Sequence, residues 1–280
     1  MTTESTLAHY AKVASFYGEF WGDGPEGSYP ANRIRWDIVR SRLKALGVKT
    51  ILEAGCGEGS PLAVLRADGY DAWGFDFSPE MIDVAATKVP VGRVWVGDAT
   101  DTNAYIPPWH LDAVIALGPF PHLDDDQQAI ALRNCAQATK PGGRVFVELR
   151  NSWFSLWTLN RYTWALFDGL LSEAPPAIRL LTERHLNLAA PPIVTDVSNY
   201  NSTFSRFNAP GDVPALFAQA GLRVETIHPY HAHACAPMYA DRDPKWFREA
   251  SLALEWPNPT YTSWQTLLRC SAFVVEAVRE

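Results

Sequence analysis

The 280-residue sequence lacks several features that would place a protein in a class at once. Its four cysteines, Cys56, Cys135, Cys235 and Cys270, are scattered without the spacing of a disulfide framework or a zinc site. We therefore expect a reduced compartment and no bound metal. No apolar run reaches transmembrane length and the first residues, Met1–Ser5, are polar. The sequence thus predicts a cytoplasmic protein that has no membrane partner.

Positive charge is also scarce, and the formal net charge is −7. No cluster of lysine and arginine occurs, which disfavours nucleic acid as a partner. Aromatic residues, in contrast, are abundant, with eleven Trp, ten Tyr and thirteen Phe. Many of them fall outside the segments that we expect to form a sheet, which indicates an aromatic-walled pocket or cap.

The most informative segment is a glycine-rich turn between an apolar run and a helical pattern. The apolar run ends at Glu53, and Gly55, Gly57 and Gly59 follow at alternate positions. Glycine lets the backbone approach a ligand closely and adopt angles that a Cβ atom forbids. A dinucleotide-binding fingerprint would place its third glycine where Ser60 stands. The spacing therefore favours a nucleoside that carries an amino acid over a pyrophosphate, and it disfavours a nicotinamide dehydrogenase.

Further apolar runs follow this turn in a regular order. Ala72–Asp76 ends in an acid about 20 residues after the first glycine, where a carboxylate can accept the two ribose hydroxyls of a nucleoside. Val94–Asp98, Leu111–Gly118 and Arg144–Glu148 are the next predicted strands. Strands and helices thus alternate between residues 50 and 150, which predicts a parallel sheet with helices on both faces.

The order of these segments resembles that of class I methyltransferases that depend on S-adenosyl-L-methionine (SAM). Glu53-Ala-Gly-Cys-Gly-Glu-Gly59 is similar to their first motif, and the resemblance spans residues 50–150. It implies an α/β fold with a Rossmann-like, seven-stranded, mostly parallel sheet, in which Ser271–Val278 is a last strand antiparallel to the fifth. It also implies SAM as the cofactor, with Asp98 and Ala99 facing the adenine. The cofactor-binding residues that it implies are Tyr10, Tyr17, Glu53, Gly55, Cys56, Gly57, Asp76, Phe77, Met81, Asp98, Ala99, Leu117 and Gly118.

Two helices are predicted before the first strand, over residues 8–22 and 32–46. Tyr10 and Tyr17 lie seven positions apart and therefore on one face of the first helix. This pattern resembles the amino-terminal helix that folds over the methionine end of SAM in many small-molecule methyltransferases, although the acids that often follow the two tyrosines are absent here. The alternative is that both tyrosines only pack the helix against the core.

The resemblance and the breaks in the pattern divide the chain into a core with a lid and two insertions. Pro175-Pro176 and Pro191-Pro192 interrupt helices in the first insertion, which we expect to cover the acceptor. The predicted segments are an N-terminal helical lid (1–48), the SAM-binding core (49–150), a cap insertion (151–208), the continuation of the core (209–235), a second cap insertion (236–266) and the final core strand (267–280).

Methyl transfer from a sulfonium is an in-line displacement, which needs a dry pocket, an aligned nucleophile and often a base. His122 is the first candidate base because it follows the fourth strand at the ligand-binding edge of the sheet. His231 and His233 alternate along a later strand and are candidates for an acid/base pair, a pocket wall or a plain surface turn. Their spacing disfavours a metal site. Tyr17 completes the candidate catalytic set.

A looser resemblance extends to methyltransferases of bacterial sugar, surface-polysaccharide and natural-product pathways. It rests on Pro121-His122, on Asn151 before an aromatic helix, and on Tyr230-His231 followed by His233. It implies a small polar acceptor that is methylated on oxygen or nitrogen. An arginine in the first insertion, Arg161, is placed to clamp an anionic group or to pair with an acid of the lid. The residues expected to contact the acceptor are Trp21, His122, Asn151, Arg161, Tyr162, Tyr200 and Tyr230.

Two other functions stay open for the same pocket. One is an enzyme that transfers or cyclises the aminoalkyl chain of SAM, which the aromatic excess would suit because aromatic faces stabilise a sulfonium charge. The other is a SAM-binding protein without catalytic activity, which the complete set of glycines and acids disfavours. In each case the expected partner is a small molecule, and the sequence leaves room for a homodimer.

Overall fold

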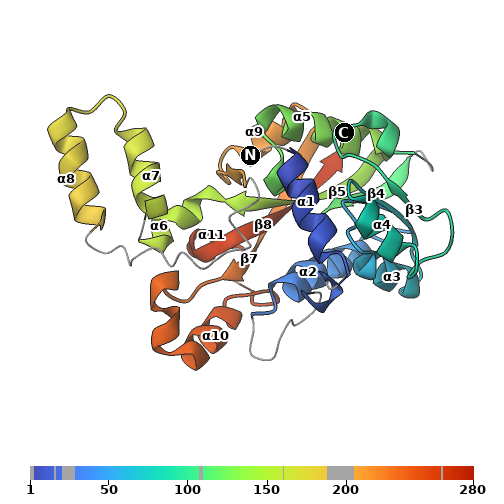
Figure 1. The fold of residues 1–280 in the computed structure, drawn as a ribbon, viewed down its shortest axis with the longest axis horizontal. Coiled ribbons are helices and arrows are strands. Elements are labelled where there is room, and N and C mark those ends of the chain that lie inside the picture. The colour runs from blue at the N-terminus through green and yellow to red at the C-terminus, as the bar shows by residue number, and fades with distance from the viewer. Residues whose placement is uncertain are drawn as a thin grey trace.

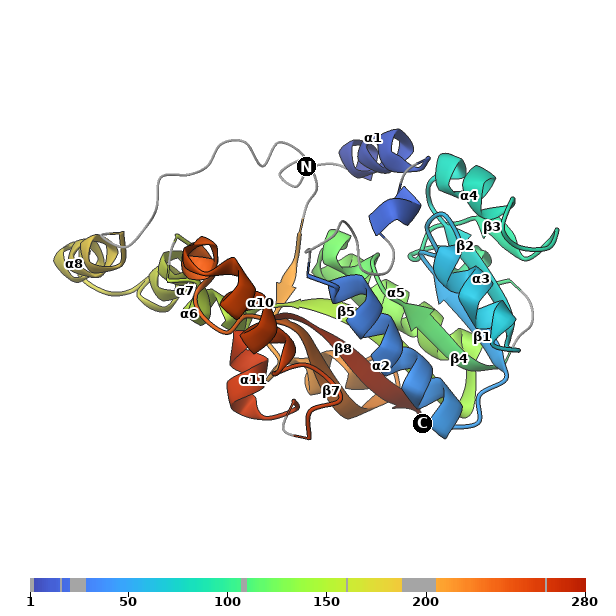
Figure 2. The same cartoon turned by 90° about the horizontal axis from the view of Figure 1, so that it is seen from below.

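The structure is a computed structural model that describes residues 3–15, 17–20, 29–106, 110–159, 161–187, 205–259 and 261–280. Its centre is one sheet (Figure 1), whose neighbouring strands follow the order β3-β2-β1-β4-β5-β8-β7, as labelled in Figure 2. The strands are β1 (Thr50–Ala54), β2 (Asp71–Asp76), β3 (Val94–Val96), β4 (Leu111–Ala116), β5 (Thr139–Asn151), β6 (Phe207–Asn208), β7 (Leu222–Ala232) and β8 (Cys270–Arg279).

The predicted fold class is confirmed by the strand pairing. β1 to β5 are parallel to one another, and β8 runs antiparallel to both β5 and β7. The two-residue strand β6, which pairs with β5, adds to the seven strands that the sequence predicts. β5 is also longer than predicted. Its first residue, Thr139, pairs with Leu111 of β4 before a register shift, so residues 139–143, which precede the predicted strand, are part of β5.

The helices lie between and around these strands, and among the described residues none is long and apolar enough to cross a membrane. The α-helices are α1 (Thr3–Val13), α2 (Ala31–Ala45), α3 (Ser60–Ala67), α4 (Pro79–Ala85), α5 (Asp125–Ala138), α6 (Ser155–Thr158), α7 (Arg161–Leu170), α8 (Pro176–Asn187), α9 (Val213–Ala218), α10 (Pro244–Leu252) and α11 (Trp264–Arg269). The 3-10 helices are η1 (Tyr17–Phe20), η2 (Thr102–Ala104), η3 (Phe120–His122), η4 (Ser152–Phe154) and η5 (Pro237–Arg242).

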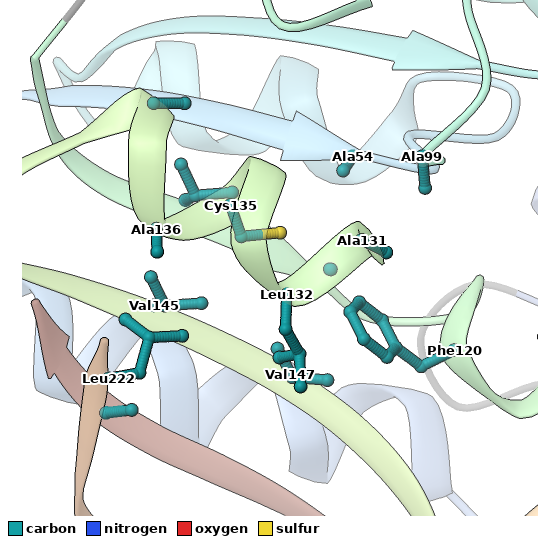
Figure 3. Close-up of a cluster of buried hydrophobic side chains, with 14 of the residues drawn as sticks. Ala54, Ala99, Phe120, Ala131, Leu132, Cys135, Ala136, Val145, Val147 and Leu222 are labelled. Atoms are coloured by element: carbon teal, nitrogen blue, oxygen red, sulfur yellow. The ribbon is translucent and has the colours of Figure 1, made fainter. Parts of the chain in front are cut away.

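The two faces of the sheet are covered by different helices. α2 and α3 bury apolar residues, including Leu43 and Leu65, with one face. α5 and α9 belong to the buried cluster on the other face, and Figure 3 shows Leu132 of α5 and Val147 of β5 within it. Burying such a side chain stabilises the fold by roughly 1.5–3 kcal/mol. This packing on both faces fixes the sheet, so the carboxyl ends of its parallel strands together form one rigid edge.

The amino-terminal region differs from the prediction of one helix over residues 8–22. α1 ends at Val13, and Tyr17 begins the separate 3-10 helix η1. In one continuous helix the two tyrosines would stand about 10 Å apart along the axis. The ring centroids of Tyr10 and Tyr17 are instead 6.0 Å apart. The break therefore brings both rings to one place, with α1 beside α4 (Figure 2).

The two insertions follow β5 and β7 at one end of the sheet. α7 and α8, from the first insertion, form an arm that stands away from the sheet in both views (Figures 1 and 2). The proline pair Pro175-Pro176 separates these two helices, in line with the helix break that proline causes. η5, α10 and α11 come from the second insertion. Strands from several of the predicted segments belong to the same sheet, so the strand pairing does not mark boundaries between them. The division into lid, core and insertions therefore stays a prediction.

Candidate functional site

A cavity lies at the carboxyl ends of β1, β2 and β4, the edge at which parallel α/β sheets bind ligands. It encloses about 660 Å³, including its open mouth. Residues of α1, η1 and α2 complete its wall. The predicted cofactor residues that line it are Tyr10, Tyr17, Glu53, Gly55, Cys56, Gly57, Asp76, Phe77, Met81, Leu117 and Gly118.

The glycine-rich turn after β1 can be built only with glycine at two positions. Gly55 has φ +77°, and a Cβ there would lie 2.9 Å from Cδ of Pro119. Gly59 has φ +81°, and a Cβ there would lie 2.8 Å from Cβ of Ala85. Left-handed backbone angles and such close approaches both exclude larger residues. The turn therefore leads directly from β1 into α3 and keeps the cavity open beside it.

Asp76 ends β2 in this cavity and is only 7% exposed. Its Oδ2 accepts a hydrogen bond from the Gly57 amide at 2.9 Å, and its Oδ1 accepts one from the Ser78 amide at 3.0 Å. Burial raises the pKa of Asp76 to about 6, although the amide bonds oppose the shift. Each carboxylate oxygen has a further lone pair, so the side chain can also accept hydrogen bonds from a ligand.

Aromatic rings cover part of the cavity and are centred on Tyr10. Its ring stands edge-on to Tyr17 at 6.0 Å and to Phe77 and His122 at 5.8 Å each. The Tyr10 hydroxyl lies 3.0 Å from Nε2 of His122. Burial raises the pKa of Tyr10, so the phenol is neutral and can donate this hydrogen bond. The structure thus brings the candidate base into direct contact with the amino-terminal helix.

Arg35 and Glu53 add opposite polar groups to the same cavity. Glu53 is 2% exposed, and burial raises its pKa well above the ordinary range. Among the described residues, neither Oε2 of Glu53 nor Nε of Arg35 has a hydrogen-bond partner. Buried polar atoms without a partner are rare in proteins, and in a cavity they indicate groups that a ligand satisfies. Arg35 is not among the residues predicted from the sequence, because one arginine in an amphipathic helix looks like any other.

The predicted adenine contacts, Asp98 and Ala99, do not line the cavity. Oδ1 of Asp98 accepts hydrogen bonds from the amide and the hydroxyl of Thr100, both at 2.7 Å. The carbonyl of Ala99 accepts from Tyr105 and Asn134, both at 3.1 Å. Asp98 nevertheless lies next to the cavity, because it follows Gly97, whose amide bonds to the carbonyl of Asp76.

Two predicted acceptor residues have structural roles instead. Nδ2 of Asn151 donates to the carbonyls of Leu267 and Cys270 at 2.7 and 2.8 Å, so the side chain joins the end of β5 to β8. Tyr230 is 2% exposed and its hydroxyl donates to Oε1 of Glu148 at 2.7 Å. Neither side chain lines the cavity. Both are held inside the sheet packing, and their direct contact with the acceptor stays a prediction.

His231 and His233 lie at the end of β7 in a series of neighbouring rings. The His231 ring is 5.2 Å from Tyr29 and 4.8 Å from His233, and His233 is 4.7 Å from Phe154. Burial lowers the pKa of His231 to about 3 and that of His233 to about 4. Both imidazoles are therefore neutral at physiological pH. His231 also has φ 60°, a left-handed angle that is uncommon outside glycine.

The remaining predicted acceptor residues cannot be placed at the cavity. Trp21 and Tyr200 lie outside the described residues. Arg161 and Tyr162 begin α7, and their side chains are outside the described part of the chain. Their contact with an acceptor therefore stays a prediction.

Comparison with known proteins gives one family match and several relatives. Residues 51–143 match a family described as a methyltransferase domain. The ubiquinone biosynthesis O-methyltransferase of Yersinia pestis is 28% identical over 159 residues, which are 56% of this chain and 64% of that protein. The chain thus matches somewhat less than two thirds of the length of this curated relative, and the match does not extend to all of either protein.

Two solved structures share the fold. The S-adenosylmethionine-dependent methyltransferase from Mesorhizobium loti has a TM-score of 0.54 at 16% identity, over 88% of this chain and 98% of that one. The magnesium protoporphyrin IX methyltransferase from Synechocystis, solved with bound SAM, has a TM-score of 0.52 at 14% identity, over 100% and 99%. At these identities the likeness shows the arrangement of the sheet and its helices.

Proposed function

We propose that the protein transfers the methyl group of SAM to an oxygen or nitrogen atom of a small polar acceptor, in line with the match of residues 51–143 to a methyltransferase domain. The observation that carries the proposal is the presence of Asp76, Glu53 and Arg35 in one cavity. These side chains complement a pair of ribose hydroxyls, an ammonium and a carboxylate, which are the polar parts of SAM. The expected cofactor thus fits the residues that are present.

Each polar residue has a distinct task in holding the cofactor. Asp76 would accept hydrogen bonds from the ribose hydroxyls. Glu53, whose Oε2 lacks a partner in the described structure, would accept from the ammonium, which also favours the ionised carboxylate. Arg35 would donate to the carboxylate of the amino acid. When bound, SAM supplies a methyl group that its positive sulfonium makes electrophilic. The faces of Tyr10 and Tyr17 suit such a positive charge.

His122 is the base in this proposal, and Tyr10 prepares it. In the proposed tautomer His122 carries its proton on Nδ1, so the neutral Tyr10 phenol donates to the lone pair of Nε2. An acceptor hydroxyl or amine that reaches Nε2 can take the place of Tyr10 as donor. Nε2 then holds the proton that the acceptor loses, and the protonated ring can donate back to the Tyr10 oxygen. The aromatic rings around Tyr10 would limit the access of water to this exchange.

The acceptor side of the proposal includes the insertions. The neutral rings of His231 and His233 are proposed as an acceptor wall rather than as bases, because their lowered pKa values make them weak proton acceptors at neutral pH. The Yersinia relative is named an O-methyltransferase, and this similarity supports a hydroxyl group as the methylated position. A cytoplasmic location and a homodimer stay predictions.

Calorimetric titration of the full chain with SAM, S-adenosylhomocysteine and NAD tests the proposal. We expect micromolar binding of the first two and no binding of NAD. The loaded protein is then screened for methyl transfer to paired hydroxylated and aminated small molecules, with the radioactive methyl group followed into the product. Absence of binding for both SAM and S-adenosylhomocysteine would refute the proposed function. Binding without transfer to any acceptor would favour a non-catalytic SAM-binding protein.

A further inference from the structure

Behind Arg35 lies a buried group of charges that the proposed reaction does not use directly. Glu148 of β5 has a side chain that is only 1% exposed, and its Oε2 accepts a hydrogen bond from Nη1 of Arg35. Its other oxygen, Oε1, accepts from the Tyr230 hydroxyl at 2.7 Å. Arg150 stands 3.8 Å from the same oxygen. Glu148 is thus held at both oxygens by strands and a helix that are far apart in the sequence.

The electrostatics keep this group ionised in spite of its burial. Burial alone would raise the pKa of Glu148, but Arg35, Arg150 and Tyr230 together lower it below its ordinary value. Glu148 in turn raises the pKa of Arg35. Buried ion pairs contribute little net stability, because removing both charges from water offsets most of their attraction. A role in orienting Arg35 explains their presence better than a role in stability.

The register of the sheet makes the contact of Tyr230 with Glu148 possible. β8 lies between their strands, and Ala272 pairs with Arg150 of β5 on one side and with Tyr230 of β7 on the other. Two strand spacings are about 9.6 Å. The small, buried Ala272 leaves room for the tyrosine to cross above β8 and reach Glu148. A larger side chain at that position would stand in the path of the phenol.

The hydrogen bond to Glu148 determines which part of the Arg35 guanidinium faces other partners. Nη1 is engaged with Glu148, so Nε and Nη2 form the remaining edge of the fork. Nε is buried and lacks a partner in the described structure, and Arg35 lines the cavity. This edge is the one that binds a carboxylate through two parallel hydrogen bonds. Without Glu148 the guanidinium would lose the carboxylate that fixes Nη1.

We propose that Glu148 and Tyr230 are positioning residues, which hold the Arg35 guanidinium in the orientation that binds the carboxylate at the amino-acid end of the cofactor. This inference rests on the proposed function, because it takes that ligand as its premise. It also gives Tyr230 a role that replaces direct contact with the acceptor. A strand at the far end of the sheet thereby affects the binding of the cofactor.

The test compares two ligands that differ only at the amino-acid end. S-adenosylhomocysteine carries the carboxylate and the ammonium, whereas methylthioadenosine has the same nucleoside without them. Calorimetry on the full chain measures both affinities for the wild type, Tyr230→Phe and Glu148→Gln. We expect Tyr230→Phe to weaken S-adenosylhomocysteine about 5-fold and Glu148→Gln at least about 20-fold. The affinity for methylthioadenosine should stay within about twofold, because that ligand does not reach Arg35.

The chain offers matched controls in a second buried network. Glu276 is 1% exposed and bonds to Arg42, also on α2, while Tyr261 bonds to His228. None of these residues lines the cavity. Glu276→Gln therefore alters a buried carboxylate that pairs with an arginine of α2, and Tyr261→Phe removes a phenol hydrogen bond away from the cavity. We expect both ligands to bind these two variants as they bind the wild type. A general loss of packing would instead weaken both ligands in all four variants.

The outcomes separate this inference from the proposed function. If the wild type binds S-adenosylhomocysteine and Tyr230→Phe binds it equally well, the positioning role is refuted while the function stands. Equal weakening of both ligands would also refute it. If Glu148→Gln does not fold, the comparison moves to Arg35→Gln. In that background we expect Tyr230→Phe to have no further effect, and an unchanged 5-fold effect would contradict the inference. A wild type that binds neither ligand would refute the proposed function itself.

Discussion

Replacing Asp76 with Asn tests how the candidate site trades stability for binding. Burial raises the pKa of this carboxyl from 3.8 to about 6. A shift of that size corresponds to about 3 kcal/mol of unfavourable free energy for the charged form in the ligand-free protein. Asp76→Asn keeps the shape and one amide-accepting oxygen, but it removes the charge. It gives up one of the two bonds to the Gly57 and Ser78 amides, which is worth about 1 kcal/mol.

We therefore expect Asp76→Asn to increase the free energy of unfolding of the ligand-free protein by about 1–2 kcal/mol at pH 7.5. The folded pKa of Asp76 is raised, so its contribution to stability is present below the unfolded pKa and is lost as the pH rises through about 6. The advantage of the variant should thus be largest at pH 7.5 and shrink toward pH 4. Urea unfolding followed by tryptophan fluorescence measures this difference.

Binding should change in the opposite direction. Hydrogen bonds from ribose hydroxyls to a charged carboxylate are each worth about 1.5–3 kcal/mol, so Asp76→Asn should weaken S-adenosylhomocysteine about 10- to 100-fold. In the wild type the ligand competes with a proton for a carboxyl group whose pKa is about 6, so the dissociation constant should rise about fivefold between pH 6 and pH 5. The variant should show no such rise. Calorimetric titrations over this pH range measure both effects.

The control variant is Asp71→Asn, at the opposite end of the same strand. Its side chain is 50% exposed and pairs with Arg93 on the surface. We expect unchanged affinity for S-adenosylhomocysteine and less than about 0.5 kcal/mol change in stability. The reasoning would be refuted if Asp76→Asn bound the ligand as tightly as the wild type, or if it destabilised the ligand-free protein at pH 7.5.

Three further changes test other parts of the structure. His122→Ala should leave the affinity for SAM within about threefold of the wild type and lower the turnover at least about 100-fold, as measured by transfer of a radiolabelled methyl group. Normal turnover would show that His122 is not the base. Glu255→Gln should stabilise the protein by about 1–3 kcal/mol at pH 8, as measured by urea unfolding, and should not stabilise it at pH 4. The reason is that burial raises the pKa of Glu255 to about 7, so the unfavourable charged form is present only at the higher pH. A stabilisation that does not depend on pH would contradict this prediction. Gly59→Ala should destabilise the protein by at least about 2 kcal/mol, because the added Cβ would lie 2.8 Å from that of Ala85. The control Gly69→Ala has open space around the added Cβ and should be destabilised only by its left-handed φ angle. Equal decreases in melting temperature for the two variants would refute the steric argument.

The parts of the site that the sequence could predict are those that depend on short stretches of chain. Gly55 and Gly59 are required by local turn geometry, and the spacing of the three glycines indicates the kind of ligand. Asp76 follows an apolar run, so its place at a strand end is also a local property. The antiparallel last strand could be predicted only through the resemblance to a family, because nothing in residues 270–279 alone specifies a direction.

The parts that the sequence could not predict depend on contacts between distant elements. Arg35 and Arg33 are alike in the sequence, and only the packing of α2 on the sheet brings Arg35 to Glu148. Tyr230 looks like an acceptor residue because polar aromatics often line pockets, yet the pairing across β8 turns it toward a buried carboxylate. The break after Val13 was also missed, because no proline marks it.

The same contrast between local and long-range contacts explains why the sequence predicts the proposed cofactor side of the cavity better than the proposed acceptor side. The cofactor side is built from loops that follow β1, β2 and β4, where the chain leaves one rigid edge. The proposed acceptor side depends on where the two insertions pack, and one of their contacts with the core is the ring series from Tyr29 through His231 and His233 to Phe154. In the described structure neither nitrogen of His233 has a hydrogen-bond partner. Burying such atoms without a partner costs free energy, so an acceptor that formed a hydrogen bond with the His233 ring would recover part of that cost.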